Sequence, residues 1–354
     1  CLASVVIDHQ DAVIVYGDHD HLDGRERRSQ PWFKSQWDQE QFLALDYVSA
    51  ACALSVTAAR EAHANERNVE SLFELLLTIA RDRAEAVVHT PHVLVHARSS
   101  EGRTPPAQRA AAIKRVLGHI GLTASEGPHG SVRVQWPLPE PAPLVSIIIP
   151  TRDKLDLIEP CVRSILTRTS YPEFEILIVD NDSSEPGTLE FFQSIQTDAR
   201  VRVLSAPICY NYSALNNLAV QEARGDFICL LNNDTEIIEP AWLTELMRHA
   251  VRPEVGAVGA KLLYGDGTIQ HAGVVVGMGD AAGHAHRNVS DDEAGYFAQP
   301  HITRSVTAVT GACLLVAKDK YLVVGGLDEQ TLAIAYNDID FCLKLRRAGW
   351  RNIY

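Results

Sequence analysis

Hydrophobic runs and polar segments alternate regularly through the second half of the chain. Residues 144–150 (LVSIIIP) and 174–179 (FEILIV) are almost wholly apolar, and shorter apolar runs follow at 201–204 and 227–231. Unbroken apolar runs of this length are typical of strands that are covered on both faces. The pattern therefore predicts a buried sheet.

Stretches with helical spacing separate these predicted strands. Apolar residues recur every three or four positions over 155–166, and helices are also expected over 187–196, 211–223 and 242–250. Strands and helices that alternate in this way form a mostly parallel sheet with helices on both faces. Ligands of such α/β sheets bind at the carboxyl ends of the strands, so the segments that follow the strands are candidates for a site.

Prolines mark a boundary ahead of this region. Four of the seven residues over 137–143 are proline, and helical spacing over 107–120 precedes them. Because proline disfavours both helices and central strands, such stretches separate domains. We expect a unit over 1–98, a linker with a short helix over 99–143, and a second unit over 144–354.

Composition narrows the class of protein. The chain has 354 residues, of which 46% are hydrophobic and 22% are charged, and this balance indicates a folded protein rather than a disordered or membrane-spanning one. Its net charge of −13, without a basic block, argues against a nucleic-acid partner.

The termini and the cysteines add two expectations. The chain starts at Cys1 rather than Met, so we expect it to be a piece of a longer protein. Its seven cysteines are scattered and show no C-x-x-C spacing, which favours reduced thiols in the cytoplasm over disulfides or zinc ligands. A peripheral position at the inner face of the plasma membrane, through regions outside this sequence, stays open.

Short acids and amides follow three of the predicted strands. They are Thr151 and Asp153, then Asp180 and Asn181, then Asn232, Asn233 and Asp234. Such residues are common in turns and at helix N-caps. Three such segments at one edge of a sheet can also hydrogen-bond a base and a ribose and bind a divalent cation through oxygen atoms.

The ordered set of segments resembles the family 2 glycosyltransferases of the GT-A fold. The matching segments are VSIIIPTRD (145–153), EILIVDNDS (175–183), LLNNDTE (230–236), VTGACLLV (309–316), GGLDE (325–329) and YNDIDFCLKLRRAGW (336–350). The resemblance covers about 144–354. It implies the GT-A form of the α/β class, a Rossmann-like and mostly parallel sheet with helices on both faces.

On the donor side, the resemblance implies binding of a nucleotide-sugar. The residues that would line or contact the nucleotide are Pro150, Thr151, Asp153, Asp180, Asn181, Asn232 and Asn233. Asp234 matches the last acid of the family's D-x-D motif and would bind Mn²⁺ or Mg²⁺ on the diphosphate. Asn232 replaces the first acid of that motif, and the lost charge should weaken metal binding.

On the acceptor side, Asp338 matches the family's catalytic base. Asn337 replaces the usual Glu, Asp340 takes the second acid position, and Gly311, Ala312 and Cys313 would lie close to the acceptor. Asp338 also starts a predicted helix, where the helix dipole favours the ionised carboxylate that a base needs. The alternative interpretation is that Asp338 only caps the N-terminus of this helix.

Histidines also occur between these segments. His271, His284 and His286 include an H-x-H pair that could bind a metal, but we favour loop residues that flank the active site.

The first unit resembles the second half of another family 2 domain. Asp18 and Asp20 would be its D-x-D pair, following a strand over 12–16. The position of the catalytic Asp is occupied by Leu72, and an aliphatic side chain cannot accept a proton, so we expect this partial GT-A-like unit to be inactive. Its front half would lie before Cys1, and a closing strand of the second unit would lie after Tyr354.

The leading hypothesis is an inverting, metal-dependent glycosyltransferase of the hexosyltransferase type. It would move a sugar from a nucleotide-sugar to a glycan or lipid-linked glycan acceptor in the synthesis of a bacterial surface polysaccharide. One alternative is a nucleotidyltransferase on a similar sheet, which would need a glycine-rich loop near the first strand. Another is an inactive carbohydrate-binding or scaffold protein derived from a glycosyltransferase.

Overall fold

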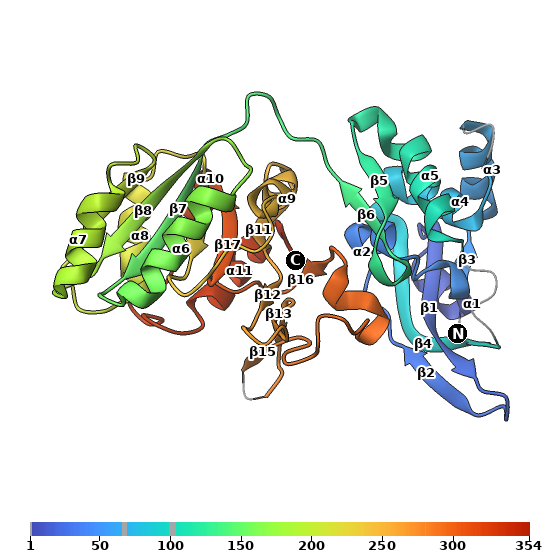
Figure 1. Cartoon of the computed structure of the whole chain (residues 1–354). Coiled ribbons are helices and arrows are strands. Elements are labelled where there is room, and N and C mark those ends of the chain that lie inside the picture. The colour runs from blue at the N-terminus through green and yellow to red at the C-terminus, as the bar shows by residue number, and fades with distance from the viewer. Residues whose placement is uncertain (1, 66–68, 99–103, 280) are drawn as a thin grey trace. The chain divides into compact units, whose positions relative to one another are not determined.

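The computed structural model describes residues 2–65, 69–98, 104–279 and 281–354 (Figure 1). These residues divide into two compact units. Unit 1 comprises Cys1–Pro137 and Ala294–Arg304, and unit 2 comprises Leu138–Glu293 and Ser305–Tyr354.

The described residues of unit 2 form an eight-stranded sheet in the order β16-β18-β11-β17-β10-β7-β8-β9. Its strands are β7 (Val145–Thr151), β8 (Phe174–Asp180), β9 (Val201–Ser205), β10 (Phe227–Leu231), β11 (Val255–Gly259), β16 (Ser305–Val306), β17 (Cys313–Ala317) and β18 (Arg351–Ile353). Strands β10, β7, β8 and β9 pair in parallel, whereas β17 runs antiparallel to both of its neighbours and β16 antiparallel to β18. The predicted mostly parallel sheet is confirmed.

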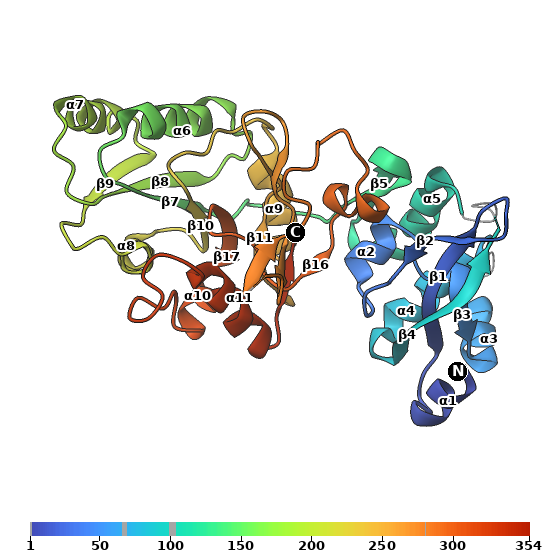
Figure 2. The ribbon, with the colours of Figure 1, turned by 90° about the horizontal axis from the view of Figure 1, so that it is seen from below.

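Helices cover both faces of this sheet (Figure 2). One face carries α6 (Leu155–Arg168), α7 (Pro186–Ile195) and α9 (Trp242–Ala250), and the other carries α8 (Tyr212–Glu222), α10 (Lys318–Val323) and α11 (Asn337–Arg347). Successive side chains of a strand point to opposite faces. Accordingly, Ile147 and Ile149 lie in one hydrophobic core and Ile148 lies in the other.

A buried carboxylate joins the parallel strands. Glu175 on β8 accepts hydrogen bonds from Ser146 Oγ (2.7 Å), from the backbone N–H of Arg224 (2.7 Å) and from Arg202 Nη2 (3.1 Å). A Cβ at Gly225 would lie 2.7 Å from the carbonyl oxygen of Leu144, so the turn before β10 requires glycine. This network fixes the ends of three strands relative to one another.

Two hairpins follow β11 in unit 2. They are β12 (Leu262–Leu263) with β13 (Ile269–His271), and β14 (Val274–Val276) with β15 (Ala282–His284). Because Val274 N–H donates to the carbonyl of Ala308 at 3.0 Å, the second hairpin lies beside the segment that leads to Gly311.

Unit 1 has a smaller sheet in which β1 pairs with β2, β3 and β4. Its strands are β1 (Ile14–Leu22), β2 (Arg28–Trp32), β3 (Cys52–Leu54), β4 (Val87–Ala97) and the hairpin β5 (Thr123–Glu126) with β6 (Val132–Gln135). Its helices are α1 (Leu2–Asp8), α2 (Gln39–Ala44), α3 (Val56–Asn65), α4 (Leu72–Asp82) and α5 (Pro106–Leu117), with short 3₁₀ segments that include η5 (Tyr296–His301).

The segment expected to be a linker belongs largely to unit 1. On α5, Ala110, Ile113 and Leu117 recur on one helical face and are buried in the unit 1 core, so this helix packs rather than bridges. Residues 99–103 of the expected linker lie outside the described residues. The core also receives Phe297 of η5, whose ring stacks on Trp32 at 4.0 Å between centroids. The observed division therefore differs from the expected boundaries at 98 and 143.

Candidate active site

A pocket of about 420 Å³ opens in unit 2 at the carboxyl ends of β7 and β10. Nine of the predicted site residues line it: Pro150, Thr151, Asn232, Asn233, Asp234, Gly311, Ala312, Asn337 and Asp338. Its volume lies within the range of small-molecule sites. The structure thus brings four separate segments of the sequence into one pocket.

Asp338 lies in the first turn of α11, as the sequence predicts. Its Oδ2 accepts a hydrogen bond from the backbone N–H of Gly311 (2.8 Å), and its Oδ1 accepts one from the N–H of Ile339 (2.9 Å). These two hydrogen bonds hold the carboxylate in a fixed orientation at the N-terminus of α11. The side chain is partly exposed to the pocket and can meet a ligand there.

Tyr212 also holds the backbone of Gly311 in place. Its hydroxyl donates to the carbonyl of Gly311 at 3.1 Å. Burial, and then the charge of Asp338, raise the pKa of this phenol far above its usual value, so it remains a donor. A Cβ at Gly311 would lie 3.4 Å from the Cβ of Asp338, which shows how closely the turn before β17 approaches α11.

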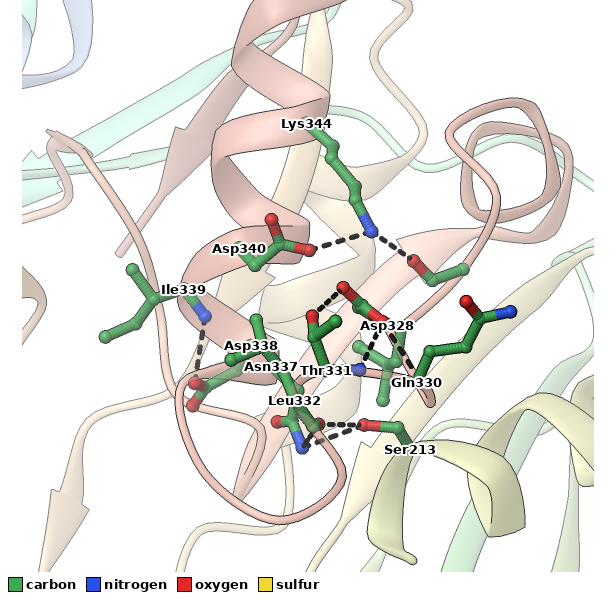
Figure 3. A network of polar contacts seen from close by, with 12 residues as sticks. Ser213, Asp328, Gln330, Thr331, Leu332, Asn337, Asp338, Ile339, Asp340 and Lys344 are labelled. Carbon is green, nitrogen blue, oxygen red and sulfur yellow. Dashed lines mark hydrogen bonds and ion pairs between the residues drawn. The ribbon is translucent and has the colours of Figure 1, made fainter.

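The loop before α11 is held by polar contacts (Figure 3). The Nδ2 of Asn337 donates to Ser213 Oγ (3.0 Å) and to the carbonyl of Leu332 (3.4 Å). Asp328 accepts from the backbone N–H groups of Gln330 (3.0 Å) and Thr331 (2.9 Å). Asn337, predicted on the acceptor side, is buried and its amide nitrogen fixes the loop.

Two other residues predicted on the acceptor side do not line the pocket. Asp340 forms an ion pair with Lys344 at 2.7 Å, one turn along α11. Cys313 is buried within β17. At these positions, Asp340 and Cys313 are better placed to support the structure of the site than to contact an acceptor.

Three residues predicted to bind the nucleotide form hydrogen bonds that hold loops together. The carboxylate of Asp153 accepts from the N–H groups of Ser184 (2.8 Å) and Glu185 (2.9 Å), and these hydrogen bonds lower the pKa of Asp153. Asn181 is buried, and its Nδ2 donates to two carbonyls over residues 206–208.

Asp180 completes this set by accepting from the N–H of Ser183 at 2.9 Å. Asp153, Asp180 and Asn181 are absent from the described residues that line the pocket. Any contact with a nucleotide therefore stays a prediction.

Asp234 is the exposed acid of the pocket. Beside it, Asn233 uses its Nδ2 to donate to Thr151 Oγ1 (2.9 Å), which leaves its amide oxygen available. Among the described residues, no three His, Cys, Asp or Glu side chains gather as a metal-binding group. One carboxylate with amide oxygens nevertheless fits Mg²⁺ or Mn²⁺, because such cations bind one or two protein carboxylates and complete their shell with water and substrate phosphate.

Sequence reasoning missed several residues that line the pocket. They are Arg152, Tyr210, Tyr212, Leu215, Thr310, Ile334, Ala335 and Tyr336. Arg152, Thr310 and Tyr336 lie within the segments that match the family. Apart from Tyr212 and Leu215, which lie on α8, these residues lie in loops, where no periodic signal indicates which side chains face a ligand.

His271 and His284 lie on short strands rather than in the expected loops. Their Nδ1 atoms are 2.9 Å apart, and the N–H of Gly273 donates to Nε2 of His271 (3.3 Å). This arrangement assigns the proton of His271 to Nδ1, which donates to His284. Burial lowers the pKa of His284, while the charge of Asp338 opposes that shift.

In unit 1, Asp18 and Asp20 lie inside β1 rather than in a turn after it, because the strand continues to Leu22. Both side chains are buried. Asp18 pairs with His89 Nε2 at 2.9 Å, and Asp20 pairs with Arg28 Nε at 2.5 Å and also with His96. Leu72 is the first residue of α4.

Comparison with known proteins defines the class. Residues 146–275 match the family described as Glycosyl transferase family 2, and the chain carries a domain of this family. The mixed, mostly parallel sheet of unit 2 is the GT-A-like α/β fold that the resemblance implied. Helices in the described part of the chain are all too short or too polar to cross a bilayer.

Two longer bacterial proteins are similar over nearly the whole chain. The "Uncharacterized protein y4gI" of Sinorhizobium fredii is 40% identical over 100% of this chain and 41% of its own length. The "O-antigen biosynthesis protein RfbC" of Myxococcus xanthus is 34% identical over 96% of this chain and 27% of its own length. The chain thus spans less than half of either relative.

Among solved structures, a mannosyltransferase of Pyrobaculum calidifontis in complex with GDP-Man and Mn²⁺ overlaps 61% of this chain and 55% of its own, with 16% identity and a TM-score of 0.46. At this level of similarity, no residue of this chain can be assigned a role from that structure.

Proposed function

We propose that unit 2 is an inverting, metal-dependent glycosyltransferase that moves a sugar from a nucleotide-sugar to a hydroxyl of a glycan acceptor. The observation that carries the proposal is one pocket holding Asp338, with its carboxylate fixed by the Gly311 N–H, together with the exposed Asp234. The similarity to a protein named for O-antigen biosynthesis supports a role in bacterial surface polysaccharide synthesis. Free thiols at the described cysteines support a cytoplasmic location.

Asp338 would act as the general base. It would accept the proton of the acceptor hydroxyl as that oxygen bonds to the anomeric carbon, while the bond from that carbon to the diphosphate breaks and its electron pair leaves with the diphosphate. Attack opposite the leaving group inverts the anomeric configuration. Asp234 would hold the divalent cation, which when bound neutralises charge on the leaving diphosphate. Arg152 adds a positive charge to the same pocket.

We propose in addition that unit 1 does not catalyse transfer. Leu72 offers no proton acceptor at the position of the base. Asp18 and Asp20 are already engaged with His89, His96 and Arg28, so neither carboxylate is free for a cation.

The proposed activity can be tested by screening UDP-, GDP- and dTDP-sugars for nucleotide release with added Mn²⁺ or Mg²⁺. Chelation should abolish release. Asp234→Ala should raise the metal concentration for half-maximal activity about 100-fold. Removing a group that only orients a metal ligand already lowers metal affinity or activity tenfold to 100-fold. Asp266→Ala, which removes an exposed acid outside the pocket, is the matched control. An unchanged metal requirement in Asp234→Ala would contradict the assignment.

A further inference from the structure

Part of the lining of this pocket, called the lip below, consists of exposed and largely apolar side chains. Among the residues that line it, Tyr210, Ile334 and Tyr336 have exposed fractions of 55%, 62% and 52%. Large apolar side chains with this exposure at the mouth of a polar pocket indicate a surface for a ligand with an apolar face. The donor and metal assignments above leave this lip unused.

Tyr336 is held in a conformation that its side chain disfavours. Its φ is +61°, in the left-handed region, where a bulky residue is unusual. Such a conformation persists only where the surrounding structure imposes it, and it is concentrated at functional sites. The carbonyl of Tyr336 accepts the N–H of Asp340 at 3.0 Å, and the buried amide of Asn337 anchors the next residue. These contacts therefore fix the backbone that carries Tyr336 beside the pocket that this residue lines.

Tyr210 is brought to the same mouth by contacts between two loops. Asn211 Nδ2 donates to the carbonyl of Glu329 at 2.9 Å, and the N–H of Ser213 donates to the carbonyl of Ala333 at 3.2 Å. These hydrogen bonds join the start of α8 to the loop before α11. The two tyrosines, 126 positions apart in the sequence, thus line one pocket.

The position of the lip assigns it to the acceptor. Tyr336 is two residues from Asp338, and a general base must lie within hydrogen-bond reach of the hydroxyl that it deprotonates. Asp234 and Arg152, which face the diphosphate in the proposed function, come from the ends of other strands, β10 and β7. A pyranose has an apolar C–H face and a polar rim, which complement the apolar face and polar hydroxyl of tyrosine.

We infer that Tyr336 and Tyr210 form an aromatic platform that binds the pyranose ring of the acceptor and presents its hydroxyl to Asp338, an inference that rests on the proposed function.

Saturation-transfer NMR on the 354-residue chain tests the platform with defined probes. These are the methyl β-D-pyranosides of glucose, galactose and N-acetylglucosamine, with UDP as the probe of the donor side. We expect saturation at the ring C–H protons of at least one glycoside. Tyr336→Ala should weaken binding of this glycoside about tenfold, the loss typical of one stacked ring, and should leave binding of UDP unchanged.

Matched variants separate recognition from folding. Tyr336→Phe keeps the ring and should bind like the wild type. Tyr336→Gly removes the ring and relieves the left-handed strain, so it should unfold at or above the wild-type temperature and still bind the glycoside poorly. Val323→Ala truncates an exposed apolar side chain outside the pocket and should change nothing.

The outcomes are distinct from those of the proposed function. Glycoside binding that is lost in Tyr336→Ala supports the platform even if no nucleotide-sugar is turned over. Equal binding by wild type and Tyr336→Ala, weakened UDP binding in Tyr336→Ala, or no glycoside binding by the wild type would each overturn it, even if turnover is observed.

Discussion

At the scale of single residues, the site depends on how groups around Asp338 are held. The backbone N–H groups of Gly311 and Ile339 donate to its two carboxylate oxygens and fix the orientation of the side chain. His284 is near enough that the Asp338 charge acts on its pKa, yet burial dominates and lowers that pKa.

The lowered pKa of His284 predicts a pH dependence of stability. Because the unfolded chain binds this proton more readily than the folded one, the free energy of unfolding should fall as pH drops below the unfolded value of about 6.5, until the folded pKa is passed. His284→Gln cannot take up that proton and should flatten this part of the profile. Urea unfolding at a series of pH values measures the effect, and equal slopes for both proteins would contradict it.

Sequence signals were strongest for Asp338 and weakest for the lip. The helical spacing after Asp338 and the surrounding motif located it in advance. Asn181 and Asp153 carry the same signal as ligand-binding residues, since amides and acids after strands also close turns, and here they bind backbone groups. Tyr210 and Tyr336 lie in loops, where no periodicity reports which way a side chain points.

At the scale of elements, continuous apolar runs predicted the parallel strands β7, β8, β9 and β10, because both faces of the sheet are covered there. The apolar pattern did not predict the antiparallel β17 or the short β14–β15 hairpin. Strand direction depends on the path of the chain and not on local hydrophobicity. Polar side chains then fix the joints between elements, as Lys320 does on α10. Its buried Nζ donates to the carbonyls of Arg252 (3.3 Å), Pro253 (3.0 Å) and Val255 (2.5 Å).

Lys320→Met should destabilise unit 2 by about 1–3 kcal/mol, because it leaves carbonyl groups buried without their donor. Lys318→Met, which removes a single bond to the carbonyl of Ala223, should cost less. Denaturant unfolding of both variants makes the comparison. A larger loss in Lys318→Met, or no loss in Lys320→Met, would show that the cluster of carbonyls does not depend on Lys320.

At the scale of the whole molecule, the structure reassigns sequence between the units. The prolines over 137–143 lie where unit 2 begins. Helix α5, which precedes them, packs into unit 1 because its small and aliphatic side chains are buried in the core of that unit. The segment 294–304 also joins unit 1, through Phe297 on Trp32. A segment that leaves one unit and returns cannot be found from local patterning, since its apolar residues give no indication of which core they enter.

The central claim is that unit 2 holds the catalytic base and that unit 1 contributes none. Asp338→Asn in the 354-residue chain tests it directly, because the amide keeps the size of the side chain but cannot take the acceptor's proton. With the best nucleotide-sugar from the screen, we expect transfer to fall by about 10³-fold while binding of the donor, measured by calorimetry, is unchanged. Wild-type transfer by Asp338→Asn would contradict the account, because another group, in either unit, would then be the base.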